Sequence, residues 1–275
     1  MTNVPAFGST LTYSWNITVI ETNFEEIKAV VFDLGGTIED MHTNSDILRD
    51  AIPKFREIAT RYNVPIGKTD SALTTQLQEG MKRYSKWKER FVVELSAPEL
   101  FRGFVFCEDP ETDHVPCVAW EKLAVCYERN FFRRVCRPES LNVLETLSKR
   151  KLKIGLISNI ISREVVYEQL EEYGISSFFQ VVATSAEYKR RKPDPFMFEE
   201  MVKQLRVSAT QAMYVGDTIS RDIAGAKRAC YGAAVQIRSG MTGLSDAGYS
   251  GYEPDLRITS LTELIDLFPP GGTNL

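Results

Sequence analysis

Small groups of polar residues stand at the ends of short apolar runs, in an order that could assemble one chemical site. The groups are Asp33-Leu34-Gly35-Gly36-Thr37, Ser158-Asn159, Lys192 in a Lys-Pro-Asp-Pro sequence, and Gly216-Asp217 followed by Asp222. A carboxylate can attack a phosphoryl group and carry it covalently. Two acidic groups can hold Mg²⁺, and a lysine, a small hydroxyl and turn amides can hold phosphate oxygens. The residue types therefore favour phosphoryl transfer.

Taken singly, each group has an ordinary structural explanation. An aspartate before glycines is most often a turn residue. Ser-Asn before a helix is by default an N-cap, and Asp222 could cap the helix that follows it. Lys192 could be a solvated lysine. The specific signal is the combination, because chance rarely supplies these groups in this order, each at a strand end or a helix start.

The elements that must position these groups alternate between strand and helix. Continuous apolar runs predict buried strands at 28–34, 152–157, 179–183, 212–215 and 232–237, with helices between them at 138–150, 163–173, 195–205 and 222–229. Buried runs of this kind are typical of parallel strands covered on both faces. The alternation predicts an α/β fold with a doubly wound, mostly parallel, Rossmann-like sheet. Ligands of such sheets bind at the carboxyl ends of the strands, where the polar groups lie.

A second region interrupts this alternation. Residues 45–136 have mostly helical spacing, with predicted helices at 47–62, 70–84, 86–95 and 118–132. We therefore expect a helical cap at 45–136, inserted into an α/β core formed by 24–44 and 137–268. Residues 1–23 form an N-terminal extension and 269–275 a tail. Residues 11–19 alternate apolar with polar side chains and predict one β-strand.

The four groups resemble the motifs of the haloacid dehalogenase (HAD) superfamily, whose members are mostly Mg²⁺-dependent phosphatases. The resemblance covers the α/β portion, and the insertion resembles the cap that many members place between motif one and motif two. It implies that Asp33 is the nucleophile that forms an aspartyl-phosphate. It also implies that Ser158, with Asn159 beside it, contacts phosphate and that Lys192 pairs with phosphate and with the nucleophile.

The same resemblance implies a metal site and a phosphate-binding turn. Mg²⁺ would be held by Asp33, by the backbone carbonyl of Gly35, by Asp217 and by Asp222, the last directly or through water. Gly36 and Thr37 belong to the turn that shapes the phosphate site. The implied activity is Mg²⁺-dependent hydrolysis of a small phosphorylated metabolite.

One position departs from the family pattern. Phosphatases of this superfamily usually carry a second aspartate two residues after the nucleophile, as general acid and then base, and here that residue is Gly35. Such catalysis is typically worth about 10²–10⁴-fold. Turnover can survive if the leaving group departs unprotonated, or if water or a cap residue substitutes. Glu39 is a candidate replacement, although we expect a solvated loop residue there.

The substitution keeps other functions open. A weakly active or non-catalytic phosphate-binding or regulatory protein would also lack the acid. Phosphonoacetaldehyde hydrolases have a small residue at this position and use a cap lysine, for which Lys68 and Lys82 are candidates. Haloacid dehalogenases have a bulky aromatic residue there and work without Mg²⁺, which fits Asp217 and Asp222 less well.

Two basic clusters lie in or beside the predicted cap. Lys82, Arg83, Lys86, Lys88 and Arg90 surround Trp87. A solvated helix face is the default interpretation, and the alternative is that one of them reaches a second anionic group of the substrate. Arg133, Arg134 and Arg137 lie near the return to the core, where they could steady a hinge or meet substrate.

Composition agrees with a globular enzyme. The 275 residues are 43% hydrophobic and 25% charged, with a net charge of −4, which gives no support to a broad nucleic-acid surface. No apolar run is long enough for a membrane helix. Five cysteines without Cys-x-x-Cys spacing, and no secretory signal, predict a cytoplasmic protein. Pairing of the N-terminal strand with a second subunit makes a homodimer one hypothesis.

Overall fold

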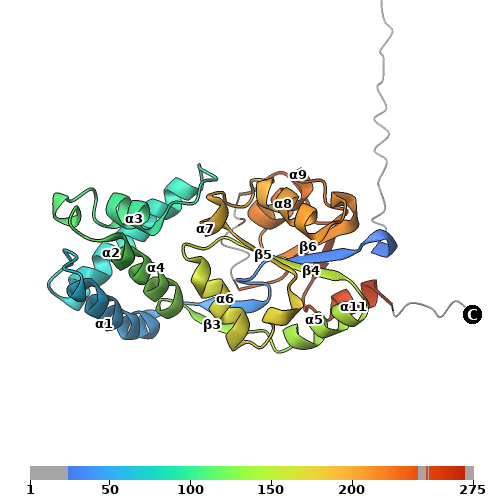
Figure 1. Ribbon diagram of the computed structural model, residues 1–275, viewed down its shortest axis with the longest axis horizontal. Helices are drawn as coiled ribbons and strands as arrows, with labels where there is room; N and C mark the ends of the chain where they lie inside the picture. The colour runs from blue at the N-terminus through green and yellow to red at the C-terminus, as the bar shows by residue number, and fades with distance from the viewer. Residues whose placement is uncertain (1–23, 241–245, 247, 270–275) are drawn as a thin grey trace, which may run out of the picture.

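The computed structural model describes residues 24–240, 246 and 248–269 (Figure 1). The strand expected at 11–19 lies outside these residues. No helix in the described part of the chain is both long and apolar enough to cross a membrane.

A six-stranded sheet forms the core, with the strand order β5-β4-β1-β6-β7-β8 and every neighbouring pair parallel. The strands are β1 (Ala29–Phe32), β4 (Lys153–Ser158), β5 (Val181–Thr184), β6 (Ala212–Gly216), β7 (Ala233–Ile237) and β8 (Leu256–Ile258). Val30 and Phe32 point to one apolar cluster, whereas Ala29 and Val31 point to another on the opposite face. This confirms the predicted doubly wound α/β fold.

Helices cover both faces of the sheet (Figure 1). One face packs against α5 (Ser140–Lys149), α6 (Arg163–Glu172) and α11 (Glu263–Leu267), and the other against α8 (Phe196–Leu205) and α9 (Ala224–Arg228). The short helix α7 (Ser185–Tyr188) follows β5 directly. Single turns of 3-10 helix at Phe24–Glu26, Pro110–Thr112, Ser176–Phe178 and Ala209–Gln211 complete the connections.

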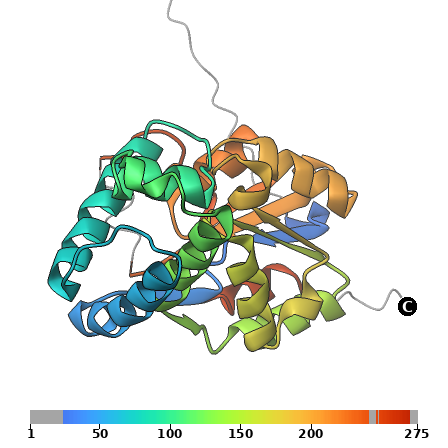
Figure 2. The same cartoon turned by 60° about the vertical axis from the view of Figure 1, so that its left-hand side comes forward.

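The inserted segment packs around an apolar cluster of its own, which contains the fully buried Trp120 and Phe55. Its helices are α1 (Ser45–Arg61), α2 (Asp70–Lys88), α3 (Ala97–Leu100), the π-helical turn Phe101–Val105 and α4 (Cys117–Asn130). Figure 2 shows these helices standing beside the carboxyl edge of the sheet. The chain enters and leaves the segment through β2 (Glu39–His42) and β3 (Arg133–Cys136), which pair antiparallel.

Three expectations about individual elements were wrong or incomplete. The helix expected at 86–95 does not form, because α2 ends at Lys88 and residues 92–94 run extended against the core. Arg191 N–H donates to Val92 O at 2.8 Å, and the aromatic and β-branched residues here favour extended backbone. The short strand β8 was missed, since it has three residues and exposes its middle one. The helix expected from Asp222 begins earlier, as a π-helical turn at Ile219–Ile223.

The packing of α2 against the π-helical turn gives a test of this arrangement. A Cβ at Gly80 would lie 2.7 Å from Val105 Cα and 3.0 Å from Phe104 O, so a backbone would have to move. We expect Gly80→Ala to destabilise the protein by about 1–3 kcal/mol, although alanine favours a helix, because overpacking outweighs propensity. Chemical denaturation measures the change. Gly240→Ala is the matched control, since a Cβ there meets nothing within 4 Å. Equal stability of the two variants would contradict the packing.

Candidate active site

The Lys192 side chain contacts several polar groups at the carboxyl edge of the sheet. Its ammonium donates to Asp33 Oδ1 at 2.6 Å and to Asp222 Oδ1 at 2.7 Å. It also contacts the Ile157 carbonyl oxygen at 3.1 Å and the Tyr214 hydroxyl at 2.9 Å. Lysine and both aspartates are almost completely buried, so this charged network is enclosed by protein. Residues from the loop after β1, from the loop before α8 and from the turn after β6 thus meet at one point.

Three carboxylates converge here. One oxygen from each of Asp33, Asp217 and Asp222 lies within 4.8 Å of the others. Asp222 Oδ2 accepts from the backbone N–H of Thr218 at 3.0 Å and from its hydroxyl at 2.6 Å. Asp217 Oδ2 accepts from the Ser239 hydroxyl at 2.6 Å. These hydrogen bonds fix the carboxylates in place.

The close approach of the loops depends on a glycine. Gly36 has φ +87°, and a Cβ there would lie 2.3 Å from Asp217 Oδ2. Any side chain would therefore both strain the backbone and displace the carboxylate. Arg137 also holds this loop, because its guanidinium donates to the Gly36 carbonyl oxygen at 2.9 Å. Arg137 directly follows β3, so it lies where the chain returns from the inserted helices to the core.

The pKa values of the three aspartates shift in different directions. Burial, together with the charge of Asp222, raises the pKa of Asp33 to about 6 against the opposing effect of Lys192. Burial, with the charges of Asp222 and Asp33, raises the pKa of Asp217 to about 7. Burial also disfavours the charge on Asp222, but Lys192 and Arg221 outweigh it and lower its pKa. The cluster thus holds more negative charge than its one ammonium offsets.

This donor set fits a divalent cation. Hard cations such as Mg²⁺ take oxygen ligands, and carboxylates are the usual protein contribution. Burial, and after it the charges of the neighbouring carboxylates, raises the pKa values of Asp33 and Asp217, and a bound cation would offset both effects. Asp33, Asp217 and Asp222, three of the four metal ligands expected from the sequence, lie close enough together to hold one.

The other predicted site residues have different surroundings. Ser158 ends β4 and lines a cavity of about 190 Å³ together with Asp33 and Lys192. Asn159 also borders it, but its amide forms a reciprocal pair with the Lys192 backbone, at 2.9 and 3.2 Å, and so holds the lysine loop. Gly36 and Thr37 do not line the cavity. The Thr37 hydroxyl is buried and has no hydrogen-bond partner among the described residues.

Gly35 lines the cavity, and the Met41 side chain lies beside the position that a side chain of residue 35 would take. A Cβ at this position would lie 3.1 Å from Met41 Sδ and 3.9 Å from Glu39 Oε1. The Met41 side chain thus occupies the space that a side chain at position 35 would enter.

The expectation of a solvated Glu39 was wrong. Glu39 is fully buried, and its carboxylate accepts from Arg134 at 2.6 Å and from the Tyr173 hydroxyl at 2.7 Å. Arg134 also pairs with Glu128 at 2.8 Å, so the three side chains clamp the β2–β3 hinge to α4. Glu39 does not line the cavity, which makes it a structural residue here.

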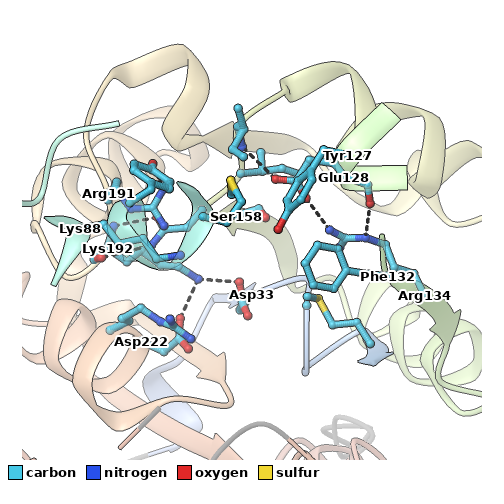
Figure 3. Close-up of a pocket in the computed structure, with 18 residues that line it drawn as sticks. Asp33, Lys88, Tyr127, Glu128, Phe132, Arg134, Ser158, Arg191, Lys192 and Asp222 are labelled. Atoms are coloured by element: carbon cyan, nitrogen blue, oxygen red, sulfur yellow. Dashed lines mark hydrogen bonds and ion pairs between the residues drawn. The ribbon is translucent and has the colours of Figure 1, made fainter. Parts of the chain in front are cut away.

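The inserted helices supply the opposite wall of the cavity, and sequence reasoning found little of it. The wall is formed by Met81, Tyr84 and Lys88 of α2, by Tyr127 and Glu128 of α4, and by Phe132. In Figure 3, Lys88, Arg191 and Lys192 lie on one side of Asp33, with Tyr127, Phe132 and Arg134 on the other. The lysines considered earlier, Lys68 and Lys82, are exposed and outside the cavity.

Arg191 and Arg221 also line the cavity. Both precede a predicted site residue directly, which was the one available signal in the sequence.

Residues 30–235 match the haloacid dehalogenase-like hydrolase family. This chain belongs to that family. The match includes every predicted site residue from Asp33 to Asp222, and it identifies the protein as a hydrolase.

Relatives of this hydrolase are similar over most of their length. A glyceraldehyde 3-phosphate phosphatase of Methanopyrus kandleri is 29% identical, with 88% of this chain and 97% of the relative covered. A phosphoglycolate phosphatase of Vibrio vulnificus is 26% identical, with 88% and 96% covered. A solved 2-haloacid dehalogenase of Pseudomonas syringae has a TM-score of 0.60 at 22% identity, with 88% and 97% covered. The structural likeness supports the fold.

The raised pKa values predict how a metal should bind to this hydrolase. Protons compete with a cation for Asp33 and Asp217 below their pKa values of about 6 and about 7. Calorimetric titration should therefore show Mg²⁺ binding weakened about tenfold or more between about pH 8 and about pH 5.5, with protons released on binding. Asp217→Asn should remove most of the affinity, and Asp50→Asn, which alters an exposed carboxylate on α1 outside the cluster, serves as control. Affinity independent of pH would contradict this assignment.

Proposed function

We propose that this hydrolase is a Mg²⁺-dependent phosphohydrolase that acts on a small phosphorylated metabolite through an aspartyl-phosphate. The observation that carries the proposal is the Asp33 carboxylate at the cavity, held by Lys192 at 2.6 Å beside two further aspartates. A carboxylate fixed in this way is oriented for attack, and the ammonium beside it can also bind the phosphoryl oxygens.

The proposed reaction has two steps. An Asp33 oxygen attacks phosphorus, the bond to the leaving oxygen breaks, and that oxygen departs with the electron pair. Water then attacks the phosphorus of the acyl phosphate, which releases inorganic phosphate and restores the carboxylate. Ser158 and Lys192 would hold the phosphoryl oxygens in both steps, since both line the cavity with Asp33.

Mg²⁺ is proposed at Asp33, the Gly35 carbonyl, Asp217 and Asp222. Bound there, it would shield the negative charges of carboxylate and phosphate from each other during in-line attack. The proposed phosphate-binding turn, Gly36 and Thr37, would act through its backbone shape, because neither residue lines the cavity.

The size of the cavity and the relatives support a small substrate. About 190 Å³ accommodates a phosphoryl group with a short carbon chain. The relatives named above are phosphatases of glyceraldehyde 3-phosphate and of phosphoglycolate, both small phosphorylated metabolites. The cap wall would exclude bulk water while the substrate is bound.

Asp33→Asn tests the nucleophile. We expect wild-type protein to hydrolyse acetyl phosphate and p-nitrophenyl phosphate with Mg²⁺, since these leaving groups need little protonation, and Asp33→Asn to lose at least about 10³-fold in kcat. Release of inorganic phosphate measures the activity. Asp266→Asn is the control, because its carboxylate is exposed on α11 and lies outside the cavity. Full activity in Asp33→Asn would exclude the mechanism.

Gly35→Asp tests the missing acid. A carboxyl group at this position should raise kcat for alkyl phosphates by about 10²-fold or more and for p-nitrophenyl phosphate much less, because only the alkoxide needs a proton. Gly35→Ala adds the Cβ without the acid and is the matched control. Since Met41 Sδ would lie 3.1 Å from the new Cβ, each variant is also made with Met41→Ala. Inactivity of wild type and of all four variants would reject the phosphatase proposal.

The alternative is a phosphate-binding or regulatory protein, favoured by one observation, the filled space at Gly35. Calorimetry would then show phosphate binding without turnover. Phosphonatase and dehalogenase activities have less support, because the lysines first considered for the former lie outside the cavity and the latter needs no three-carboxylate site. The cytoplasm remains the proposed location and a homodimer one proposed assembly.

A further inference from the structure

Five basic side chains line the cavity, and three of them are neutralised by acids. Lys192 pairs with Asp33 and Asp222, Arg134 with Glu39 and Glu128, and Arg191 with Glu94. Lys88 and Arg221 remain. In the described part of the chain, neither has a carboxylate partner.

Lys88 and Arg221 make few polar contacts with the described residues around them. The Lys88 ammonium lies 5.5 Å from the centroid of the Tyr84 ring, a weak cation–π contact, and no described acceptor bonds to it. The Tyr84 hydroxyl donates to Glu94 at 2.6 Å and accepts from Arg191 at 3.5 Å, and it forms no hydrogen bond with Lys88. Among the residues that the structure describes, Arg221 forms one hydrogen bond, from its Nε to the Thr218 hydroxyl at 3.3 Å, and none from its terminal nitrogens.

The local field is positive around Lys88. Burial, together with the charges of Arg191 and Arg221, lowers the pKa of Lys88 to about 8 against the opposing effects of Glu94 and Glu128. A half-buried ammonium that is repelled by two guanidinium groups is unfavourable in the free protein. A bound anion would remove that cost, so the arrangement favours an anionic ligand group.

We propose that Lys88 and Arg221 bind a second anionic group of the substrate, on the leaving-group side of the phosphate. The substrate class is therefore a short phosphate ester that also carries a carboxylate or a second phosphate. This inference rests on the proposed function of the site. It selects Lys88 from the basic cluster at the end of α2 as the residue that meets substrate.

The position of the pair fits this role. Arg221 precedes Asp222 directly, so it lies beside the phosphate site, whereas Lys88 comes from the opposite, helical wall. Figure 3 shows Lys88 next to Arg191 and Lys192, on one side of Asp33. A ligand with two anionic ends would contact core and cap together, and a cavity of about 190 Å³ leaves room for only a short chain between them.

Matched substrates test the proposal by kinetics. Phosphoglycolate and 2-hydroxyethyl phosphate differ only in a carboxylate against a hydroxymethyl group. Wild-type kcat/KM should favour phosphoglycolate, and Lys88→Met and Arg221→Gln should each reduce that preference about tenfold or more, mainly through KM. Lys88→Arg should retain part of it. Lys82→Met removes an exposed lysine of the same helix and should leave the preference unchanged.

Binding provides the second measurement, which does not need turnover. In Asp33→Asn with Mg²⁺, calorimetry compares phosphoglycolate and pyrophosphate with methyl phosphate. Tighter binding of phosphoglycolate alone assigns a carboxylate, and tighter binding of pyrophosphate alone a phosphate. Either preference should disappear when Lys88→Met is added.

The two proposals fail separately. Equal binding of all three ligands, or a preference that survives both Lys88→Met and Arg221→Gln, overturns the second anion site even if acetyl phosphate is hydrolysed. A preference that depends on Lys88 in a protein without phosphatase activity retains the anion site and rejects only the hydrolytic function.

Discussion

The structure depends on keeping three carboxylates buried together beside a single ammonium group. Asp33, Asp217 and Asp222 would repel one another in a site closed to water, and Lys192 offsets only part of that repulsion. Hydrogen bonds from Thr218 and Ser239 hold the carboxylates together against the repulsion that remains. Gly36 belongs to this solution, because only a residue without a side chain lets its loop approach Asp217.

Strand order explains how these residues meet. β1 lies between β4 and β6, so the loops that follow the three strands converge at one edge. The loop that carries Lys192 is then fixed by Asn159, whose amide binds the lysine backbone in both directions. A residue that resembled a phosphate ligand in the sequence is thus engaged in positioning the ammonium group.

Ion pairs and hydrogen bonds join the inserted helices to the core on both sides of the cavity. The buried Arg191–Glu94 pair joins the core to the segment after α2, and Tyr84 donates to the same glutamate. At the hinge, Arg134 bridges Glu39 and Glu128. Both networks hold the helical wall over the carboxylates, and in each of them a buried guanidinium is paired with an acid.

The α/β core, the helical nature of the inserted segment and the grouping of the three carboxylates could be predicted from the sequence alone, because buried parallel strands and the residues after them leave short, local patterns. The tertiary structure decided what depends on distant contacts. Residues 92–94 pair with the core instead of extending a helix, Met41 fills the space beside Gly35, and Glu39 is buried by Arg134. Which lysine of the α2 cluster faces the cavity was likewise decided by packing, since the direction of a side chain depends on residues far away in sequence.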